Sequence, residues 1–364
     1  MPLLHIANTH FELELIEKKR SPLIQSIESH PIFLQLQFLP FLYASNHDGI
    51  AVTHSPPEKF WQNLKDFGIN PPHLHLLTEK KVLNYERVES WGYSEQIKQW
   101  ADDHRIRYQM PPLSIVKLVN SKAFSFSSSP QLPNAKLLYT EAEASNWLEQ
   151  PGPKVLKTCF GVSGKGHLIL EKSESTTSPR VRSFLNKEFG EQLPVIAEPW
   201  VSRLLDFSTQ WMVHSQQHIQ ELGAVLCKNT SKGSYVSTIA GSPQKLFGSN
   251  LSYLEEHRNI AKDILKKMAR LGYFGPVGID AMLYVAPDGQ TVLQPIVEIN
   301  ARKTMGWVAL HMHLRYFPLQ TLELTFSSPS EEEKGLLPQN LSISTGSLVS
   351  FQKQLYIRQQ ERLL

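Results

Sequence analysis

The chain has 364 residues, of which 41% are hydrophobic, and its formal net charge is only +3. This length exceeds what one ordinary hydrophobic core organises, so we expect a soluble two-domain protein with several buried layers. The small net charge argues against nucleic acid or a membrane surface as a partner attracted by charge. The sequence has no run near the ~20 apolar residues of a membrane span and no N-terminal signal pattern, so we expect no membrane contact.

The cysteine content indicates a reducing compartment. The chain has two cysteines, Cys159 and Cys227, which provide no disulfide framework. We therefore expect a cytoplasmic location. Cys159 lies beside a glycine-rich segment, but its only basic neighbours in the sequence are lysines. A small packed thiol is favoured over a reactive one.

Residues 1–110 alternate short apolar runs, such as Gly49-Ile-Ala-Val-Thr53, with polar helical segments. One of these segments, at 57–68, has a proline near its first turn and a glycine at its end, which is typical of a helix. The alternation predicts a small α/β domain. Pro111-Pro112 then marks a domain boundary, because successive prolines keep the chain extended and end a preceding helix.

A glycine-rich segment follows this boundary. The serine-rich stretch 125–130 is expected to be a loop, and Lys154-Val-Leu-Lys157 is typical of a short strand. Three glycines within 161–166 then let backbone N–H groups approach an anion closely, and the apolar run 167–170 follows. This order predicts a phosphate-binding loop between two strands. It is neither a Walker loop nor a Rossmann fingerprint, since no helix follows, and an ordinary hairpin is the alternative.

The segment 255–271 is the clearest predicted helix. Its apolar residues recur with helical spacing, acidic residues occupy its start, and a glycine follows. We expect it to cover the sheet that carries the acidic residues described next. His311 and His313 lie in a mostly apolar helical segment, so packing is favoured over a role as a base. The segment 326–364 is expected to be a linker and a tail.

The residues with the clearest chemistry lie between 276 and 302, in a predicted β-hairpin. Asp280 lies in its first strand, and Glu298-Ile-Asn-Ala-Arg302 ends its second strand. Side chains two positions apart on a strand share a face, so Glu298, Asn300 and Arg302 are expected to form one row opposite Asp280. Carboxylate and amide oxygens suit Mg²⁺, and an arginine binds a carboxylate or phosphoryl group with two hydrogen bonds. The alternative is a solvated strand face with a cross-strand ion pair.

Together these motifs resemble the ATP-grasp superfamily of ATP-dependent carboxylate ligases, over roughly residues 111–315. The resemblance implies an α/β (α+β) fold in which two subdomains clamp ATP, preceded by a small Rossmann-like α/β domain. It implies three parts of the chain, namely an N-terminal domain at 1–110, an ATP-grasp domain at 111–325, and the linker and tail at 326–364. Within the ATP-grasp domain it implies a flap at 157–170, a hinge at 195–201 and a metal-binding hairpin at 276–302.

The resemblance also implies roles for individual residues. The nucleotide would contact two lysines, the flap, the hinge strand and an acid near the ribose, namely Lys122, Lys157, Gly161, Ser163, Gly164, Gly166, Glu198, Trp200, Val201 and Asp206. The metal ligands would be Asp280, Glu298 and Asn300. Arg302 and Lys157 would be catalytic, and the substrate would contact Arg203, Tyr235 and Arg302.

The activity that this resemblance implies is that of a ligase. With ATP and Mg²⁺, or Mn²⁺ in its place, a substrate carboxylate would become an acyl phosphate and release ADP. An amine would then displace phosphate to form an amide or peptide bond. The implied partners are small carboxylates and amines, with a homodimer left open. One alternative is a kinase-like phosphotransferase, and another is a catalytically silent ATP-binding regulatory protein. The complete set of lysines, acids and arginine disfavours the regulatory protein.

Overall fold

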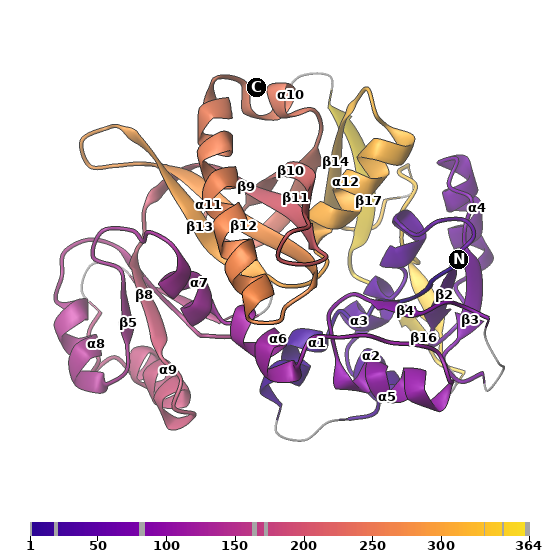
Figure 1. The fold of residues 1–364 in the computed structure, drawn as a ribbon, viewed down its shortest axis with the longest axis horizontal. Coiled ribbons are helices and arrows are strands. Elements are labelled where there is room, and N and C mark those ends of the chain that lie inside the picture. The colour runs from indigo at the N-terminus through magenta and orange to yellow at the C-terminus, as the bar shows by residue number, and fades with distance from the viewer. Residues whose placement is uncertain are drawn as a thin grey trace. The chain divides into compact units, whose positions relative to one another are not determined.

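The computed structural model describes residues 2–17, 21–79, 84–161, 166–170, 174–330, 332–343 and 346–360. The chain divides into two compact units (Figure 1). The first unit comprises Met1–Leu113, Ser237–Leu246 and Arg302–Leu364, and the second comprises Ser114–Val236 and Phe247–Ala301. The predicted division at 1–110, 111–325 and 326–364 is based on sequence motifs and stays a prediction.

The N-terminal part of the first unit is a parallel sheet flanked by helices. Its four strands lie in the order β3-β2-β1-β4, and each neighbouring pair is parallel. The strands are β1 (Leu4–Ile6), β2 (Gly49–Val52), β3 (His73–Leu76) and β4 (Val88–Ser90). The helices are α1 (Phe11–Ile16), α2 (Leu23–Glu28), α3 (Pro31–Leu36), η1 (Leu39–Leu42), α4 (Glu58–Asp66) and α5 (Glu95–Asp103). These residues thus have the expected mixture of helices and parallel strands.

The later segments of the first unit contribute antiparallel strands and a long helix. β14 (Thr321–Ser327) pairs with β11 (Tyr235–Ala240) and with β17 (Gln354–Gln360), while β15 (Asn340–Ser342) pairs with β16 (Leu348–Ser350). The helices of this part are α10 (Pro243–Phe247) and α12 (Met305–Tyr316). The segment expected to be a linker and a tail therefore contains strands. Its apolar residues explain the difference, since Leu355 and Tyr356 are buried in β17.

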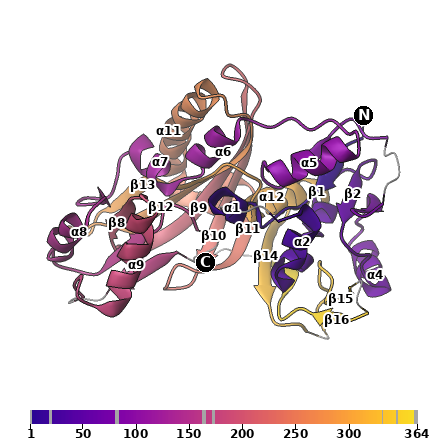
Figure 2. The same ribbon diagram turned by 90° about the horizontal axis from the view of Figure 1, so that it is seen from below.

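The first sheet of the second unit is antiparallel, with the strand order β5-β8-β6-β7. Its strands are β5 (Lys136–Leu138), β6 (Lys154–Lys157), β7 (His167–Leu170) and β8 (Val195–Pro199). Helices α8 (Glu141–Leu148) and α9 (Pro179–Gly190) lie beside this sheet (Figure 2). Their apolar residues share a buried cluster with Leu156 and Ala197 of the strands. Because strand residues alternate between faces, Lys157 and Glu198 lie on the opposite face.

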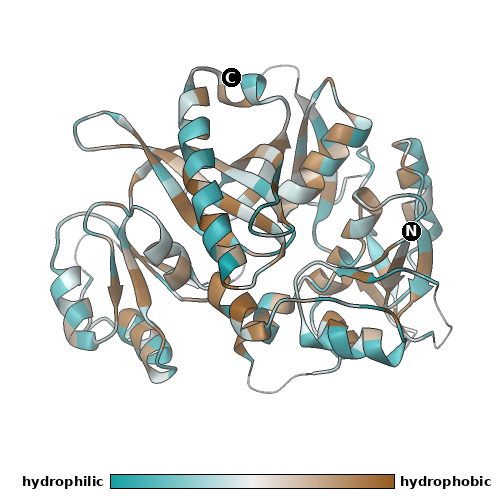
Figure 3. Ribbon diagram, in the orientation of Figure 1, coloured by the Kyte–Doolittle hydropathy of each residue, from teal (hydrophilic) through white to brown (hydrophobic). Residues whose placement is uncertain are grey.

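The second antiparallel group of this unit has the strand order β13-β12-β9-β10. Its strands are β9 (Ser202–Val213), β10 (Ile219–Asn229), β12 (Gly275–Val285) and β13 (Thr291–Asn300). The predicted helix is present as α11 (Leu251–Arg270) after η2 (Gly248–Asn250), and it presents polar residues outward (Figure 3). It begins four residues before the predicted start. No helix in the described part of the chain is long and apolar enough to cross a membrane.

Two short helices, α6 (Leu113–Val119) and α7 (Lys122–Ser128), precede these sheets. The expected loop at 125–130 is wrong for its first four residues, which end α7. Ser121 caps this helix, because its hydroxyl accepts a hydrogen bond from the Phe124 N–H at 3.1 Å. The Ser125 hydroxyl accepts a hydrogen bond from the Ile299 N–H at 3.1 Å. These serines therefore stabilise a helix and the neighbouring strand, rather than a loop.

A buried histidine fastens α11 to the strands beneath it. His257 Nδ1 lies 2.7 Å from the Pro295 carbonyl oxygen, and its Nε2 lies 2.7 Å from Thr209 Oγ1. A carbonyl only accepts, so Nδ1 carries the proton and Nε2 accepts from the threonine hydroxyl. That hydroxyl in turn accepts a hydrogen bond from Trp211 Nε1 at 2.8 Å. The chain of bonds is complete only when His257 is neutral.

Acid should destabilise the second unit through His257. Burial lowers the pKa of this ring from its usual 6.5 to about 4. Between these two values the unfolded chain binds a proton that the folded chain does not. The free energy of unfolding should therefore fall by roughly 3 kcal/mol as the pH drops from 6.5 to 4, and the loss from this group should end there.

Urea unfolding at several pH values tests this expectation. A His257→Gln variant should be less stable at pH 7 and should lack this part of the pH dependence. His73→Gln, which changes an exposed histidine of β3, serves as the matched control. The explanation fails if the His257→Gln variant keeps the full pH dependence of the unchanged protein.

Candidate functional site

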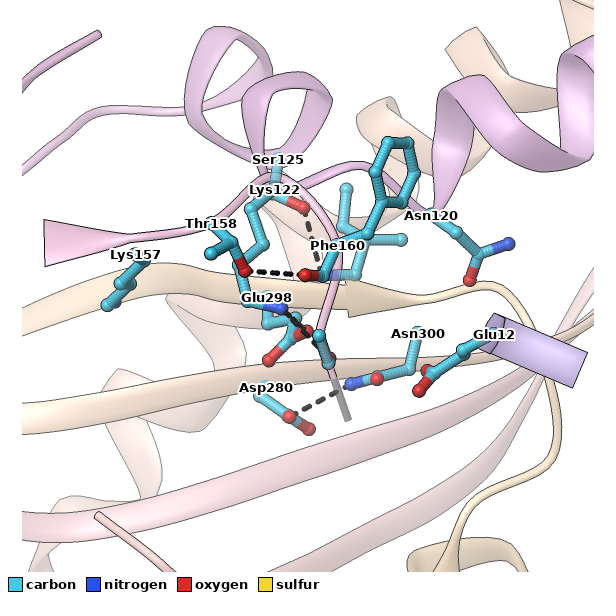
Figure 4. Close-up of polar contacts among 12 residues, drawn as sticks. Glu12, Asn120, Lys122, Ser125, Lys157, Thr158, Phe160, Asp280, Glu298 and Asn300 are labelled. Carbon is cyan, nitrogen blue, oxygen red and sulfur yellow. Dashed lines mark hydrogen bonds and ion pairs between the residues drawn. The ribbon is translucent and has the colours of Figure 1, made fainter. Parts of the chain in front are cut away.

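Two neighbouring strands of the second unit carry the predicted acidic residues. In the antiparallel register of β12 and β13, Asp280 lies directly opposite Glu298, so the two side chains share a face. Asn300 follows two positions later on that face, and its Nδ2 donates a hydrogen bond to Asp280 Oδ2 at 2.9 Å (Figure 4). The structure thus brings these three side chains together as the hairpin pattern predicts.

The row of polar residues ends at Asn300. β13 stops there, and the next N–H, from Ala301, donates to Asn120 Oδ1 at 3.0 Å instead of continuing the strand ladder. Arg302 consequently lies beyond the strand and belongs to the first unit. The expectation that Arg302 extends the strand row is wrong, because a side-chain acceptor replaces the neighbouring strand.

A lysine from α7 contacts this row. Lys122 Nζ donates to Glu298 Oε1 at 2.6 Å and to the Gly161 carbonyl oxygen at 3.3 Å (Figure 4). The Lys122 backbone N–H also donates to the Cys159 carbonyl oxygen at 2.9 Å. Both side chains of the ion pair are largely shielded, with 15% of Lys122 and 28% of Glu298 exposed. One cationic group therefore connects the acidic row with the start of the glycine-rich segment.

A second lysine–carboxylate pair lies on the β5-β8-β6-β7 sheet. Lys157 Nζ of β6 donates to Glu198 Oε2 of β8 at 2.6 Å. The pair lies on the face opposite α8 and α9, and less than a fifth of each side chain is exposed. β8 ends at Pro199, so Trp200 and Val201 of the predicted hinge form the link from β8 to β9.

The structure describes the first and last residues of the predicted phosphate loop, Gly161 and Gly166. Its flanking strands β6 and β7 are antiparallel neighbours, with Lys157 opposite His167. Gly166 has φ +93°, and a Cβ there would lie 2.5 Å from Thr158 Oγ1. A side chain would thus be strained by both the backbone conformation and the space. Gly161 accepts the Lys122 bond described above, whereas Ser163 and Gly164 lie outside the described residues.

Asp206 lies in a polar group on β9 and β10. Its Oδ2 accepts hydrogen bonds from Arg203 at 3.2 Å and from Asn229 at 2.9 Å. The Arg203 guanidinium also stacks over the Trp200 ring, 4.7 Å from its centre. Arg203, predicted to contact the substrate, thus lies beside two predicted nucleotide contacts, Trp200 and Asp206. Tyr235, the other soft substrate candidate, is partly buried at the start of β11.

Arg302 has an acidic partner that the sequence does not predict. Its Nε donates to Glu12 Oε1 of α1 at 2.6 Å, and its Nη1 donates to the Lys303 carbonyl oxygen at 3.2 Å. Only 16% of the Arg302 side chain and 12% of the Glu12 side chain are exposed. The pair lies within the first unit.

Three residues that hold these groups were not predicted, namely Glu12, Asn120 and Ser125. Glu12 and Arg302 are 290 positions apart, so no local pattern connects them. Asn120 lies in the same short segment as Lys122, and proximity to a predicted phosphate lysine is the only signal that could have marked it. Ser125 was assigned to a loop because of its serine-rich surroundings.

The structure supports packing roles for Cys159, His311 and His313, for which the sequence favoured packing over chemical reactivity. Cys159 is buried, and burial raises the pKa of its thiol to about 11. Its Sγ lies 3.2 Å from the Pro194 carbonyl oxygen. His311 stacks on Trp307 within α12, and His313 is buried on the same helix. The predicted packed thiol is confirmed.

Comparisons with known proteins define the fold. No protein-family model matches the chain, and no curated protein matches it in sequence. Solved structures match it. Biotin carboxylase from Campylobacter jejuni, in its β,γ-ATP complex, is 12% identical, with a TM-score of 0.54 over 100% of this chain and 88% of the other. N5-carboxyaminoimidazole synthetase from Staphylococcus aureus is 9% identical, with a TM-score of 0.51 over 99% of this chain and 93% of the other.

A longer enzyme also contains this fold. Pyruvate carboxylase from Rhizobium etli is 13% identical, with a TM-score of 0.53, and the match covers 86% of this chain. The chain spans only 35% of the length of that enzyme. The chain therefore shares the fold of these enzymes, which confirms the α/β fold class that the sequence resemblance implies.

The oxygen atoms on β12 and β13 suit a divalent cation. Asp280, Glu298 and Asn300 supply two carboxylates and one amide oxygen, which are the hard donors that Mg²⁺ takes before water and phosphate complete its shell. Among the described residues, no group of three or more His, Cys, Asp or Glu side chains could hold a metal. This composition therefore suits a cation that also binds phosphate oxygens, rather than one enclosed by protein alone.

Removal of Lys122 should strengthen cation binding to the nucleotide-free protein. The Lys122 ammonium group lies 2.6 Å from Glu298 Oε1. A cation that binds Glu298 therefore has to displace this ammonium group. In a Lys122→Met variant, the affinity for Mn²⁺ should rise about three- to tenfold, because a competing positive charge is gone. Electron paramagnetic resonance of free Mn²⁺ measures this affinity. Lys136→Met, an exposed change on β5, should have no effect, and an unchanged affinity in Lys122→Met would contradict the site.

Proposed function

We propose that the protein is an ATP-dependent carboxylate–amine ligase, which forms an amide or peptide bond and releases ADP and phosphate. The observation that supports this proposal most directly is the arrangement of charges in the second unit. Lys122 pairs with Glu298 and Lys157 pairs with Glu198, both at 2.6 Å, and Asp280 lies opposite Glu298. Cations on two elements and carboxylates on a strand pair are the groups that a metal–triphosphate complex requires.

The proposed nucleotide contacts combine these positions with those that the sequence resemblance implies. The phosphates are bound by the two lysines and the glycine-rich segment, and the base and ribose by the link after β8 and by the Asp206 group. The full set is Lys122, Lys157, Gly161, Ser163, Gly164, Gly166, Glu198, Trp200, Val201, Arg203 and Asp206. Asp280, Glu298 and Asn300 would hold Mg²⁺ or Mn²⁺, which would neutralise phosphate charge and make the γ-phosphorus more electrophilic.

Binding of the metal–nucleotide complex exchanges the partners of both lysines. Lys122 would then bind a phosphate oxygen in place of Glu298, and the Glu298 carboxylate would be available to hold the cation. Lys157 likewise exchanges Glu198 for phosphate. Lys122, Lys157 and Glu298 would each have a partner before and after binding, which avoids the cost of an unpaired buried ion at these three groups. The protein positions reactants and balances charge, so no nucleophilic side chain is needed.

The chemical step proceeds in two displacements. A substrate carboxylate oxygen attacks the γ-phosphorus, a new O–P bond forms, and the bond to the β-phosphate oxygen breaks to release ADP. An amine then attacks the acyl carbon, and phosphate leaves with the electrons of the C–O bond while the amine proton passes to solvent. Arg302 binds the carboxylate, a preorganised role whose loss commonly costs about 3 to 4 kcal/mol. Tyr235 is a weaker substrate candidate.

Two further predictions accompany this activity. The cysteine usage favours the cytoplasm, and a homodimer is compatible with the fold, since a solved relative of the same fold, the biotin carboxylase domain of Hydrogenobacter thermophilus 2-oxoglutarate carboxylase, is described as a dimer. That domain is 13% identical, with a TM-score of 0.53 over 98% of this chain and 85% of the other.

The function is tested by measuring ADP and phosphate release with Mg·ATP across a matrix of carboxylic acids and amines, with products identified by mass spectrometry. A ligase requires both an acid and an amine and yields a condensed product. A phosphorylated hydroxyl compound would instead favour a phosphotransferase. Tight nucleotide binding without turnover across the matrix would favour a regulatory protein.

Glu298→Gln should abolish turnover while the fold stays intact. The amide keeps the shape of the side chain but loses the charge that both Lys122 and the cation use. ADP release should fall by a factor of about 100 or more, the size typical for loss of a charge-stabilising group, with unchanged circular dichroism. Glu256→Gln, an exposed change on α11, should keep full activity. Wild-type turnover in Glu298→Gln would remove the residue from the site.

A further inference from the structure

The first unit contains a cavity lined by residues that the proposed nucleotide site does not use. Its volume is about 110 Å³, and α4, the segment 333–340 and β17 contribute most of its lining. All of these elements belong to the first unit. A cavity of roughly 150 Å³ has room for benzene, whereas one water molecule takes about 30 Å³. The space therefore suits a small organic molecule.

The lining of this cavity runs from the surface into the core. Lys59 and Glu333 are exposed, whereas Phe60 and Leu337 are buried, with 1% and 2% of each residue exposed. A molecule can therefore enter from solvent and place an apolar part against the buried side chains. Apolar walls with a few polar groups are typical of sites for small molecules.

Hydrogen bonds between distant segments hold the walls of the cavity. The Asn63 side chain of α4 donates to the Gly335 carbonyl oxygen at 2.9 Å. The buried Gln35 side chain donates to the carbonyl oxygens of Pro338 and Lys353, at 3.1 and 2.7 Å. Because these bonds fix backbone groups on two sides, the cavity is part of the tertiary structure of the first unit.

A buried oxygen in the cavity wall has no hydrogen-bond partner among the described residues. This atom is Gln354 Oε1, and only 2% of Gln354 is exposed. The other end of the same amide lies 2.8 Å from the Pro338 carbonyl oxygen. A carbonyl only accepts, so that end is the nitrogen and the free end is the oxygen. An unpaired buried acceptor is unfavourable, and a donor in the cavity would satisfy it.

Gly335 leaves this oxygen uncovered by a side chain. A Cβ at position 335 would lie 2.6 Å from Gln354 Oε1, which is closer than atoms can pack. Both residues line the cavity. Any side chain at 335 would therefore displace the oxygen or cover it, and glycine permits the close approach of a ligand.

Tyr356 supplies a donor on the same side of β17. It lies two positions after Gln354, so the two side chains share a face, and both line the cavity. The Tyr356 hydroxyl accepts a hydrogen bond from the Ser330 N–H at 2.8 Å, and its own proton can still be donated. The charged lining residues, Lys59 and Glu333, have opposite signs. The cavity therefore favours a neutral molecule that carries both a donor and an acceptor.

We propose that this cavity binds a small neutral amide, either a primary carboxamide or a lactam, attached to an apolar ring. The ligand N–H donates to Gln354 Oε1, and the ligand carbonyl oxygen accepts from the Tyr356 hydroxyl. Both kinds of amide present the N–H and the carbonyl on the same side, which suits two partners on one strand face. The ring packs against Phe60 and Leu337. This site does not depend on the proposed ligase activity.

Calorimetric titration of benzamide and 2-pyridone into the full chain tests the proposal. At least one of them should bind with a Kd below about 1 mM, within the range for ligands of this size. N,N-dimethylbenzamide, which has no N–H, should bind at least about tenfold more weakly than benzamide. If neither amide binds, the cavity holds only water and the proposal fails. Equal affinity for benzamide and its dimethyl derivative also overturns it.

Variants of the lining locate the bound amide. Gln354→Met removes the acceptor at similar side-chain size, and Gly335→Ala puts a methyl group against it. Each should weaken the binding of benzamide at least about tenfold. Gln62→Met makes the same change at an exposed position of α4 that does not line the cavity, and it should leave binding unchanged.

Circular dichroism shows which of these variants are folded. Tyr356→Phe keeps the buried ring and removes only the hydroxyl, so it provides the decision if the changes at 354 and 335 prevent folding. It should also weaken the binding of benzamide, by about five- to tenfold. Unchanged affinity in any folded variant of Gln354, Gly335 or Tyr356 would place the amide elsewhere and overturn the proposal.

Discussion

The register between β12 and β13 is the constraint on which the candidate site depends. It sets Asp280 opposite Glu298 and, with the two-residue period of a strand, puts Asn300 on the same face. A slip of one residue would turn the whole row to the other face. One end of the pair is held from outside the hairpin, because Asn120 and the Ser125 hydroxyl bind backbone groups at the end of β13.

Charge neutrality is the second organising feature. Lys122, Lys157 and Arg302 are each paired with a carboxylate at 2.6 Å, and Arg203 is paired with Asp206 at 3.2 Å. Such shielded pairs contribute little net stability, since desolvation offsets most of their attraction. Their value lies in function. They keep the charged groups in place and let a ligand of opposite charge replace one partner at small cost.

Local sequence patterns succeeded where the deciding interactions are local. The alternation within 276–302 predicts a hairpin, and the paired register of β12 and β13 confirms it. The glycine-rich segment and its flanking strands were predicted for the same reason. The predicted secondary structure was wrong where a residue distant in the sequence determines whether a helix or a strand forms. α7 includes residues assigned to a loop because β13 uses a hydroxyl from that helix, and β17 forms because β14 offers it an edge.

The sequence by itself determined the ATP-grasp resemblance, the acidic row and the lysines, because strand periodicity and glycine content act within a few residues. Only the tertiary structure decided the partner of each charged group. Lys122 and Glu298 are 176 positions apart, and Arg302 and Glu12 are 290 apart. A contact at such a separation depends on how sheets and helices pack, and no short-range pattern encodes it.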